Sequence, residues 1–206
     1  MLRKIASFVL TLLLAALPVS AQKVGVVMSG GGAKGLYHIG VLEALEQNGV
    51  PVDYVAGTSM GSIIAAMYAA GYSPAEMRAI VSSGVVRDWV AGRIDPNRYM
   101  AYYRQLGNNP GFLSMRIDIE GPAGKRLRAP RNLISSTQID MALTELFAPA
   151  TAAAGGDFDR LMVPFLCVAI DMNSRGPVVM RRGDLSEAVR SSMSIPLVFK
   201  PMVKDS

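Results

Sequence analysis

The sequence predicts an α/β fold with a mainly parallel sheet covered by helices. Two successive segments each run from an apolar stretch through a glycine-containing turn into residues with apolar side chains at helical spacing, the pattern of strand, turn and helix. Short connections between such units favour parallel strands, because each helix crosses back over the sheet before the next strand begins. Half of the 206 residues are apolar and only 18% are charged, so the chain can bury a sizeable core.

The first unit begins with residues 23–29 (KVGVVMS), which are almost continuously apolar, as is usual for a buried parallel strand. A glycine-rich loop follows directly, at residues 30–35. The next apolar side chains recur at helical spacing, at Leu36, Ile39, Leu42 and Leu45. Gly49 and Pro51 end this predicted helix.

The second unit carries a serine at the apex of its turn. Residues 52–56 form the predicted strand, and Gly57-Thr58-Ser59-Met60-Gly61 follows, with a glycine two residues to each side of Ser59. A tight turn of this kind forces its central residue into a strained backbone conformation, and side chains at the flanking positions would collide. The Ser59 hydroxyl would be held in the open, at the start of a helix that ends at Gly71. We predict that Ser59 is a nucleophile and that its elbow consists of Gly57, Thr58, Met60 and Gly61.

The rest of the chain supplies further helices and strands. Helices are expected at residues 74–83 with Ser73 as N-cap, from the capping-box pair Ser135 and Gln138 until Pro149, and at residues 185–193. Strands are expected at residues 113–119, 163–171 and 178–181. Between residues 84 and 109 the pattern weakens while aromatic residues gather, namely Trp89, Tyr99, Tyr102 and Tyr103.

The first 21 residues have the features of a secretory signal peptide. A short basic start is followed by an apolar stretch from Ile5 to Leu17, and small residues precede Gln22. A membrane-spanning helix needs about 20 apolar residues, so this stretch is short for a transmembrane anchor. We therefore expect cleavage after Ala21, export of a catalytic domain at residues 22–206, and a location in the periplasm, at the outer membrane or outside the cell.

Charge and cysteine content exclude several functions. Removal of Arg3 and Lys4 with the signal peptide lowers the formal net charge from +5 to +3, too small an excess to indicate nucleic-acid binding. One cysteine, Cys167, rules out an internal disulfide, and its apolar neighbours favour a buried thiol. With one histidine and one cysteine the usual zinc spacings cannot be built, so we expect no metal and no cofactor.

The loop Gly30-Gly31-Gly32-Ala33-Lys34-Gly35 allows more than one interpretation. In a dinucleotide-binding loop the ribose-binding acid follows the second strand, whereas Asp53 precedes it. A phosphate-binding P-loop needs Ser or Thr after the lysine, but Gly35 follows Lys34. Consecutive glycine N–H groups at a helix N-terminus would form an oxyanion hole, which also explains a serine turn at the end of the neighbouring strand. We favour the oxyanion hole and keep a nucleotide-binding module as the alternative.

The general base is not a histidine. A Ser-His-Asp hydrolase of the usual α/β order needs a histidine after the serine, and the chain's one histidine, His38, lies before it. We interpret His38 as a packing or surface residue of the first helix. A carboxylate hydrogen-bonded to the serine can serve instead, since general base catalysis requires only reach and a suitable pKa.

Three motifs in order resemble those of the patatin-like phospholipases. Residues 30–35 match the family's glycine-rich oxyanion loop, and residues 57–61 match its G-x-S-x-G. Residues 192–199 (SMSIPLVF) resemble its S-x-S-x-P-x-x-F segment, so that the similarity covers roughly residues 23–203. The resemblance implies a three-layer fold with helices on both faces of the sheet. It also implies a lipid acyl hydrolase with a Ser–Asp dyad, phospholipid substrates and contact with a membrane surface.

The family's Asp-Gly motif, which carries the dyad aspartate, is absent from these 206 residues. Asp171 is followed by Met172, Asp184 by Leu185 and Asp205 by Ser206. We interpret Asp171 as a strand-end acid that bonds to the backbone and Asp184 as a helix N-cap. The sequence is therefore expected to be a catalytic domain truncated before its aspartate, which would lie beyond residue 206, and an inactive fragment is a further alternative. By resemblance, the full-length form would be attached to an outer-membrane barrel.

Overall fold

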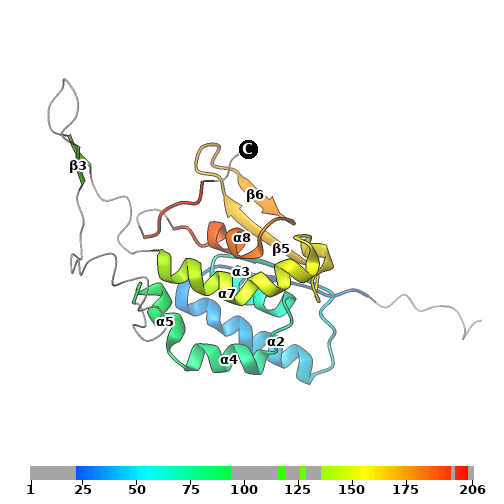
Figure 1. Cartoon of the computed structure of the whole chain (residues 1–206). Coiled ribbons are helices and arrows are strands. Elements are labelled where there is room, and N and C mark those ends of the chain that lie inside the picture. Colours follow the sequence, from blue (N-terminus) through cyan, green and yellow to red (C-terminus); the bar gives the residue numbers. More distant parts are fainter. Residues whose placement is uncertain (1–21, 94–115, 119–125, 129–135, 196–197, 204–206) are drawn as a thin grey trace, which may run out of the picture.

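The computed structural model describes residues 22–93, 116–118, 126–128, 136–195 and 198–203 (Figure 1). The predicted signal peptide, Ser135 of the predicted capping box, the three tyrosines between residues 99 and 103, and Asp205 lie outside these residues. In the part of the chain that is described, none of the helices has the length and apolar character needed to cross a bilayer.

The main sheet has four strands in the order β1-β2-β5-β6. β1 (Gly25–Met28), β2 (Tyr54–Thr58) and β5 (Phe165–Ile170) are parallel, and β6 (Pro177–Met180) runs antiparallel to β5. A separate antiparallel pair consists of β3 (Arg116–Asp118) and β4 (Arg126–Arg128). In the main sheet Met28 is level with Gly57, and Gly57 with Cys167. β1 and β2 therefore end at the same height, and the loops that follow them lie next to each other.

The helices follow the apolar periodicity. The first unit continues from a 3₁₀ turn, η1 (Gly32–Leu36), into α2 (Tyr37–Gln47), and the second continues into α3 (Met60–Ala69). α4 (Pro74–Ser82) begins with the expected cap: Ser73 and Glu76 form a complete capping box. The remaining helical segments are α5 (Val85–Val90), α7 (Thr137–Ala154), η2 (Phe158–Arg160) and α8 (Leu185–Ser192).

Two helices differ from the sequence-based expectation. α5 falls in a stretch where the sequence shows no clear pattern, because six residues are too few to establish a period of 3.6. The sequence predicts that α7 ends before Pro149, yet the helix continues to Ala154 and ends at Gly155, whose φ is 63°. Pro149 is exposed, so water can satisfy the carbonyl that loses its hydrogen bond, while buried Phe147 and Ala154 hold both sides of the proline in place.

Within the described residues, the helices pack on one face of the sheet. α3 contacts β1, β2 and β5, α8 contacts β5, and α2 packs on α3 and α4 (Figure 1). The opposite face exposes Val27 (81%), Tyr54 (45%) and Val179 (54%). The α/β class and the mainly parallel sheet are thus confirmed, and of the helices expected on two faces the described part contains those of one.

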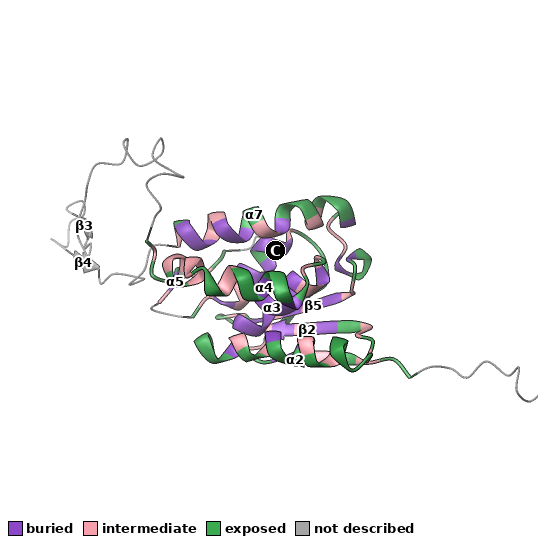
Figure 2. Ribbon diagram, turned by 90° about the horizontal axis from the view of Figure 1, so that it is seen from below, coloured by how far each residue is buried: buried purple, intermediate pink, exposed green. Residues whose placement is uncertain are grey.

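α3 forms the centre of the core. Nine of its ten residues are buried, so that the helix is enclosed by the sheet on one side and by α2, α4, α7 and α8 on the others (Figure 2). A helix that is apolar on nearly all sides is stable only in such a position. The burial of α3 fixes its first residue at the end of β2, which is where the turn with Ser59 lies.

Candidate active site

Ser59 occupies a strained turn between β2 and α3. Its backbone has φ 54° and ψ −126°, and among the described residues only Ser59 and Arg175 combine a side chain with a positive φ. Such a conformation costs about 1–3 kcal/mol and persists only where the surrounding structure enforces it. Ser59 is the N-cap of α3, but its hydroxyl makes no capping hydrogen bond. The hydroxyl is therefore not committed to the helix, unlike that of most N-cap serines.

The two glycines of the elbow are required by close backbone approach. A Cβ on Gly57 would lie 2.6 Å from the Cα of Ser62, and a Cβ on Gly61 would lie 2.6 Å from the carbonyl oxygen of Ser29. Real Cβ atoms do not approach backbone so closely. The elbow thus packs closely against the end of β1 and the first turn of α3, and this packing restricts the backbone conformation of Ser59.

The glycine-rich loop lies directly against Ser59. A Cβ on Gly30 would lie 3.0 Å from the Ser59 Cβ and 3.6 Å from its Oγ. Gly31 and Gly32 follow with φ 151° and 56°, and η1 begins at Gly32. The first N–H groups of a helix have no partner within it and carry a partial positive charge. The start of η1 therefore lies two residues after Gly30, the loop residue that lies closest to the Ser59 side chain.

The other residues of the loop anchor it or remain exposed. Gly35 is buried against the side chain of Met60, which a Cβ would meet at 2.6 Å. Lys34 is exposed, and its backbone N–H donates to the Gly31 carbonyl at 3.2 Å. His38 Nε2 lies 3.0 Å from the Ser29 carbonyl, which can only accept, so His38 supports the chain that enters the loop.

Ser192, at the end of α8, forms a hydrogen bond with the backbone of Ser59. The Ser59 N–H donates to the Ser192 Oγ at 2.8 Å, and the Ser192 hydroxyl donates to the Val168 carbonyl at 2.5 Å. The Thr58 hydroxyl donates to the same carbonyl at 2.9 Å. The sequence places Ser192 only at the start of the S-x-S-x-P-x-x-F segment and does not predict this contact, because 133 residues separate the partners.

The carboxylates after the elbow are engaged elsewhere. Asp171 accepts from the backbone N–H groups of Asn173 (2.9 Å) and Ser174 (3.2 Å). Hydrogen bonds from the Ser174 hydroxyl and from these amides hold the pKa of Asp171 below its usual value. Asp184 caps α8 through the Glu187 N–H at 3.1 Å. Both match the roles expected for them, and among the described residues no carboxylate is hydrogen-bonded to Ser59.

Among the described residues, neither Cys167 nor a cluster of titratable groups forms a second candidate reactive centre. Cys167 is completely buried in β5, and burial raises the pKa of its thiol to about 11, which keeps it protonated and unreactive at neutral pH. Within the described ranges, no three His, Cys, Asp or Glu side chains converge in a way that could hold a metal ion.

A small apolar cavity lies beside the elbow. It has a volume of about 20 Å³ and is lined by residues of η1, α3, α4, α5 and α7, among them Leu36, Met60, Ile63, Trp89 and Leu143. Met60 follows the nucleophile directly, and Leu36 follows the glycine-rich loop. The half-buried Trp89 belongs to this lining, whereas the tyrosines that the sequence groups with it lie outside the described residues.

Comparison with known proteins gives one family. The model of the family described as patatin-like phospholipase matches residues 26–206. Lysophospholipase NTE1 of Yarrowia lipolytica is 53% identical over 53 residues, which make up 26% of this chain and 4% of that protein. An uncharacterized NTE family protein of Mycobacterium tuberculosis is 29% identical over 184 residues, 89% of this chain and 25% of that protein. The chain thus spans a quarter or less of the length of these relatives.

Among solved structures, the chain is similar to ExoU of the type III secretion system of Pseudomonas aeruginosa, seen in its complex with SpcU. The TM-score is 0.46 at 20% identity, over 84% of this chain and 36% of that one.

Proposed function

Since the chain belongs to the patatin-like phospholipase family, a family of lipid ester hydrolases, we propose that Ser59 is the nucleophile of a lipid acyl hydrolase. The observation that carries the proposal is the strained backbone of Ser59, whose hydroxyl is free of the helix cap and faces the glycine-rich loop. Strain of this kind is maintained where a side chain must be held in one orientation.

In the proposed reaction the Ser59 Oγ attacks the carbonyl carbon of an ester, and its proton passes to a base. The oxyanion that forms accepts hydrogen bonds from the N–H groups of Gly31 and Gly32. Collapse of this intermediate releases the alcohol, which takes a proton, and leaves an acyl group on Ser59. Attack by water then releases the fatty acid and restores the serine. The base in this proposal is the aspartate of the Asp-Gly motif that the family resemblance implies.

The substrate side of the proposal depends on the surroundings of Ser59. The apolar cavity beside Met60 is the proposed place for an acyl chain, although at about 20 Å³ it must widen to hold one. The exposed Lys34 sits on the loop that faces the ester and suits an anionic head group. With a signal peptide at residues 1–21, the enzyme would act on lipid outside the cytoplasm.

The test is the Ser59→Ala variant of the full-length protein. Release of fatty acid from lysophosphatidylcholine and from phosphatidylglycerol vesicles is expected to fall by at least about 10³-fold. A fluorophosphonate probe should label the wild type on Ser59 and leave the variant unlabelled, while circular dichroism should be the same for both. Ser191→Ala is the matched control, because the Ser191 hydroxyl donates only to the Glu187 carbonyl of its own helix. Undiminished hydrolysis by a folded Ser59→Ala variant would contradict the proposal.

A further inference from the structure

The end of α8 makes a direct polar contact with the nucleophile turn. The Ser192 Oγ accepts the Ser59 N–H at 2.8 Å and donates to the Val168 carbonyl of β5 at 2.5 Å. One hydroxyl thus joins the turn to the neighbouring strand of the sheet. The Ser59 N–H belongs to the Thr58–Ser59 peptide, and the orientation of this peptide sets φ of the nucleophile.

We propose that Ser192 is a positioning residue that holds the strained backbone of Ser59 in its reactive orientation. The inference rests on the proposed function of Ser59. A backbone N–H in a half-buried turn needs an acceptor, and here the acceptor is a side chain from an element far along the chain. Without it, the Thr58–Ser59 peptide can rotate toward a relaxed conformation. The Ser59 Oγ would then move away from Gly30 and the loop that follows.

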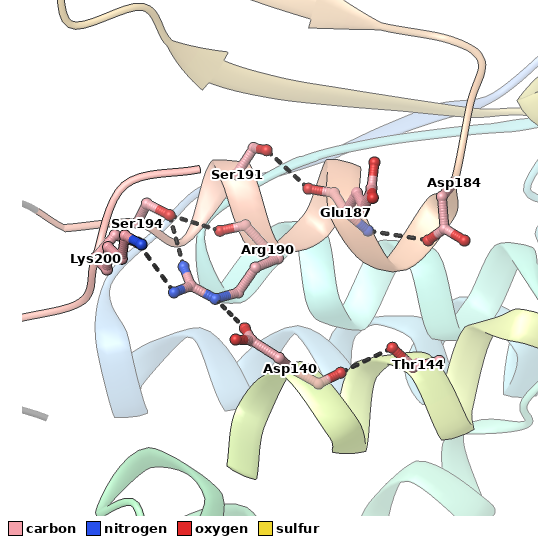
Figure 3. Close-up of polar contacts among 8 residues, drawn as sticks. All are labelled: Asp140, Thr144, Asp184, Glu187, Arg190, Ser191, Ser194 and Lys200. Carbon is pink, nitrogen blue, oxygen red and sulfur yellow. Dashed lines mark hydrogen bonds and ion pairs between the residues drawn. The ribbon is translucent and has the colours of Figure 1, made fainter. Parts of the chain in front are cut away.

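Arg190, two residues before Ser192, fixes this end of α8 through the polar contacts drawn in Figure 3. Its guanidinium donates from Nε to the Asp140 carboxylate of α7 at 2.5 Å, from Nη1 to the Ser194 hydroxyl at 2.6 Å and from Nη2 to the Lys200 carbonyl at 3.0 Å. The guanidinium also lies over the ring of Phe199, 5.3 Å from its centre. Arg190 is only 3% exposed. A buried arginine with all these partners locks the last turn of α8 to α7 and to the chain that follows it.

The neighbouring Ser191 lies on the same turn of α8 but forms its hydrogen bond within the helix. Its hydroxyl donates to the Glu187 carbonyl one turn back in α8, at 2.8 Å, and does not reach the elbow. Ser191 and Ser192 are therefore a matched pair. The two have the same side chain on the same turn of the same helix, and only Ser192 contacts Ser59.

The experiment compares Ser192→Ala and Ser191→Ala in the full-length protein, with p-nitrophenyl butyrate as the ester. For Ser192→Ala we expect kcat to fall about 10- to 100-fold while KM changes less than about twofold, since displacement of a reacting group by around 1 Å has effects of this size. The rate of fluorophosphonate labelling of Ser59 should fall by the same factor. Ser191→Ala should retain both rates. Ser192→Thr, which keeps the hydroxyl, should recover most of the loss.

Normalisation to the folded fraction separates positioning from stability. If Ser192→Ala lowers Tm but leaves kcat and the labelling rate per folded molecule unchanged, Ser192 is structural only and the proposal is wrong. If Ser192→Ala does not fold, Ser192→Cys preserves the shape with a weaker acceptor, and an unchanged labelling rate in that variant would equally overturn it. Ser59→Ala, measured alongside, distinguishes this failure from failure of the proposed function, because only the latter leaves Ser59→Ala active.

Discussion

The nucleophile elbow (residues 57–61) and the glycine-rich loop (residues 30–35) occupy equivalent positions after two neighbouring parallel strands, yet they are held in different ways. The elbow is enclosed. The Ser59 carbonyl accepts from the Ser62 hydroxyl at 2.6 Å and from the Ser62 N–H at 2.9 Å, and the Ser59 N–H is bound by Ser192. In the loop, residues 31–34 are exposed, and a Cβ on Gly32 would meet nothing within 4 Å.

The difference shows that the glycines of the elbow and of the loop are required for two different reasons. In the elbow, glycine is needed because other backbone occupies the space of a side chain. At Gly32 there is room, and glycine is needed because φ is 56°, a conformation that residues with a side chain rarely adopt. Substitutions of the elbow glycines, Gly57 and Gly61, should therefore damage the fold, whereas substitution of the exposed Gly32 should damage the site and leave the fold intact.

The largest expected effect is that of Gly61→Ala. The new Cβ would lie 2.6 Å from both the Met28 carbonyl carbon and the Ser29 carbonyl oxygen, so that β1 and α3 must separate. We expect the free energy of unfolding, measured by urea denaturation, to fall by about 3 kcal/mol or more. Gly40→Ala is the control, since this exposed glycine of α2 has nothing within 4 Å and the change should stabilise the helix by about 0.5–1 kcal/mol. Equal stabilities of the two variants would show that the elbow is not enclosed.

Gly32→Ala should lower activity while leaving stability almost unchanged, the opposite of Gly61→Ala. A methyl group fits, but the positive φ is unfavourable for alanine by about 1 kcal/mol, and the loop would relax by turning its N–H groups. We expect kcat for p-nitrophenyl butyrate to fall about 100-fold, the lower end of the range for loss of one oxyanion-hole donor, with Tm little changed. Gly32→Asn should retain more activity, since asparagine tolerates a left-handed backbone. A large loss of Tm in Gly32→Ala without loss of kcat would show that Gly32, like the elbow glycines, is needed for the fold and not for the site.

The sequence predicts the local structure around Ser59 well, because the signals for it are close together in the chain. A strand, a glycine-flanked serine and a buried helix lie within 20 residues, and the expected boundaries of β2 and α3 differ from the observed ones by two residues at most. Contacts between distant segments leave no such pattern. The bond between Ser59 and Ser192, the burial of Arg190 beside Asp140 and the antiparallel direction of β6 depend on how α7, α8 and the sheet pack together, which periodicity does not encode.

The smallest expected effect concerns Cys167, which pairs with Gly57 in the sheet. The ionisation of its thiol therefore measures how well the strand next to the elbow is protected from water. Burial raises the pKa of its thiol from an ordinary 9.0 to about 11. Between these pH values the thiol ionises only in the unfolded chain, so the folded state binds more protons and stability falls as pH rises. Relative to Cys167→Ala, the wild type should lose about 1 kcal/mol of unfolding free energy between pH 8 and pH 10.

A chemical probe tests the same enclosure more directly. In native protein at pH 8, the buried thiol of Cys167 should react with dithionitrobenzoate only as fast as the protein unfolds. The residues around Lys34, in contrast, are exposed to solvent in the folded protein. In Ser192→Ala the thiol should react faster, because the hydroxyl that bridges Ser59 and the carbonyl of Val168, the residue after Cys167, is lost. Rapid reaction in the wild type would mean that α8 opens readily from the sheet. The strain at Ser59 would then have to be held without Ser192, by the elbow glycines and by the hydrogen bonds from Ser62 to the Ser59 carbonyl.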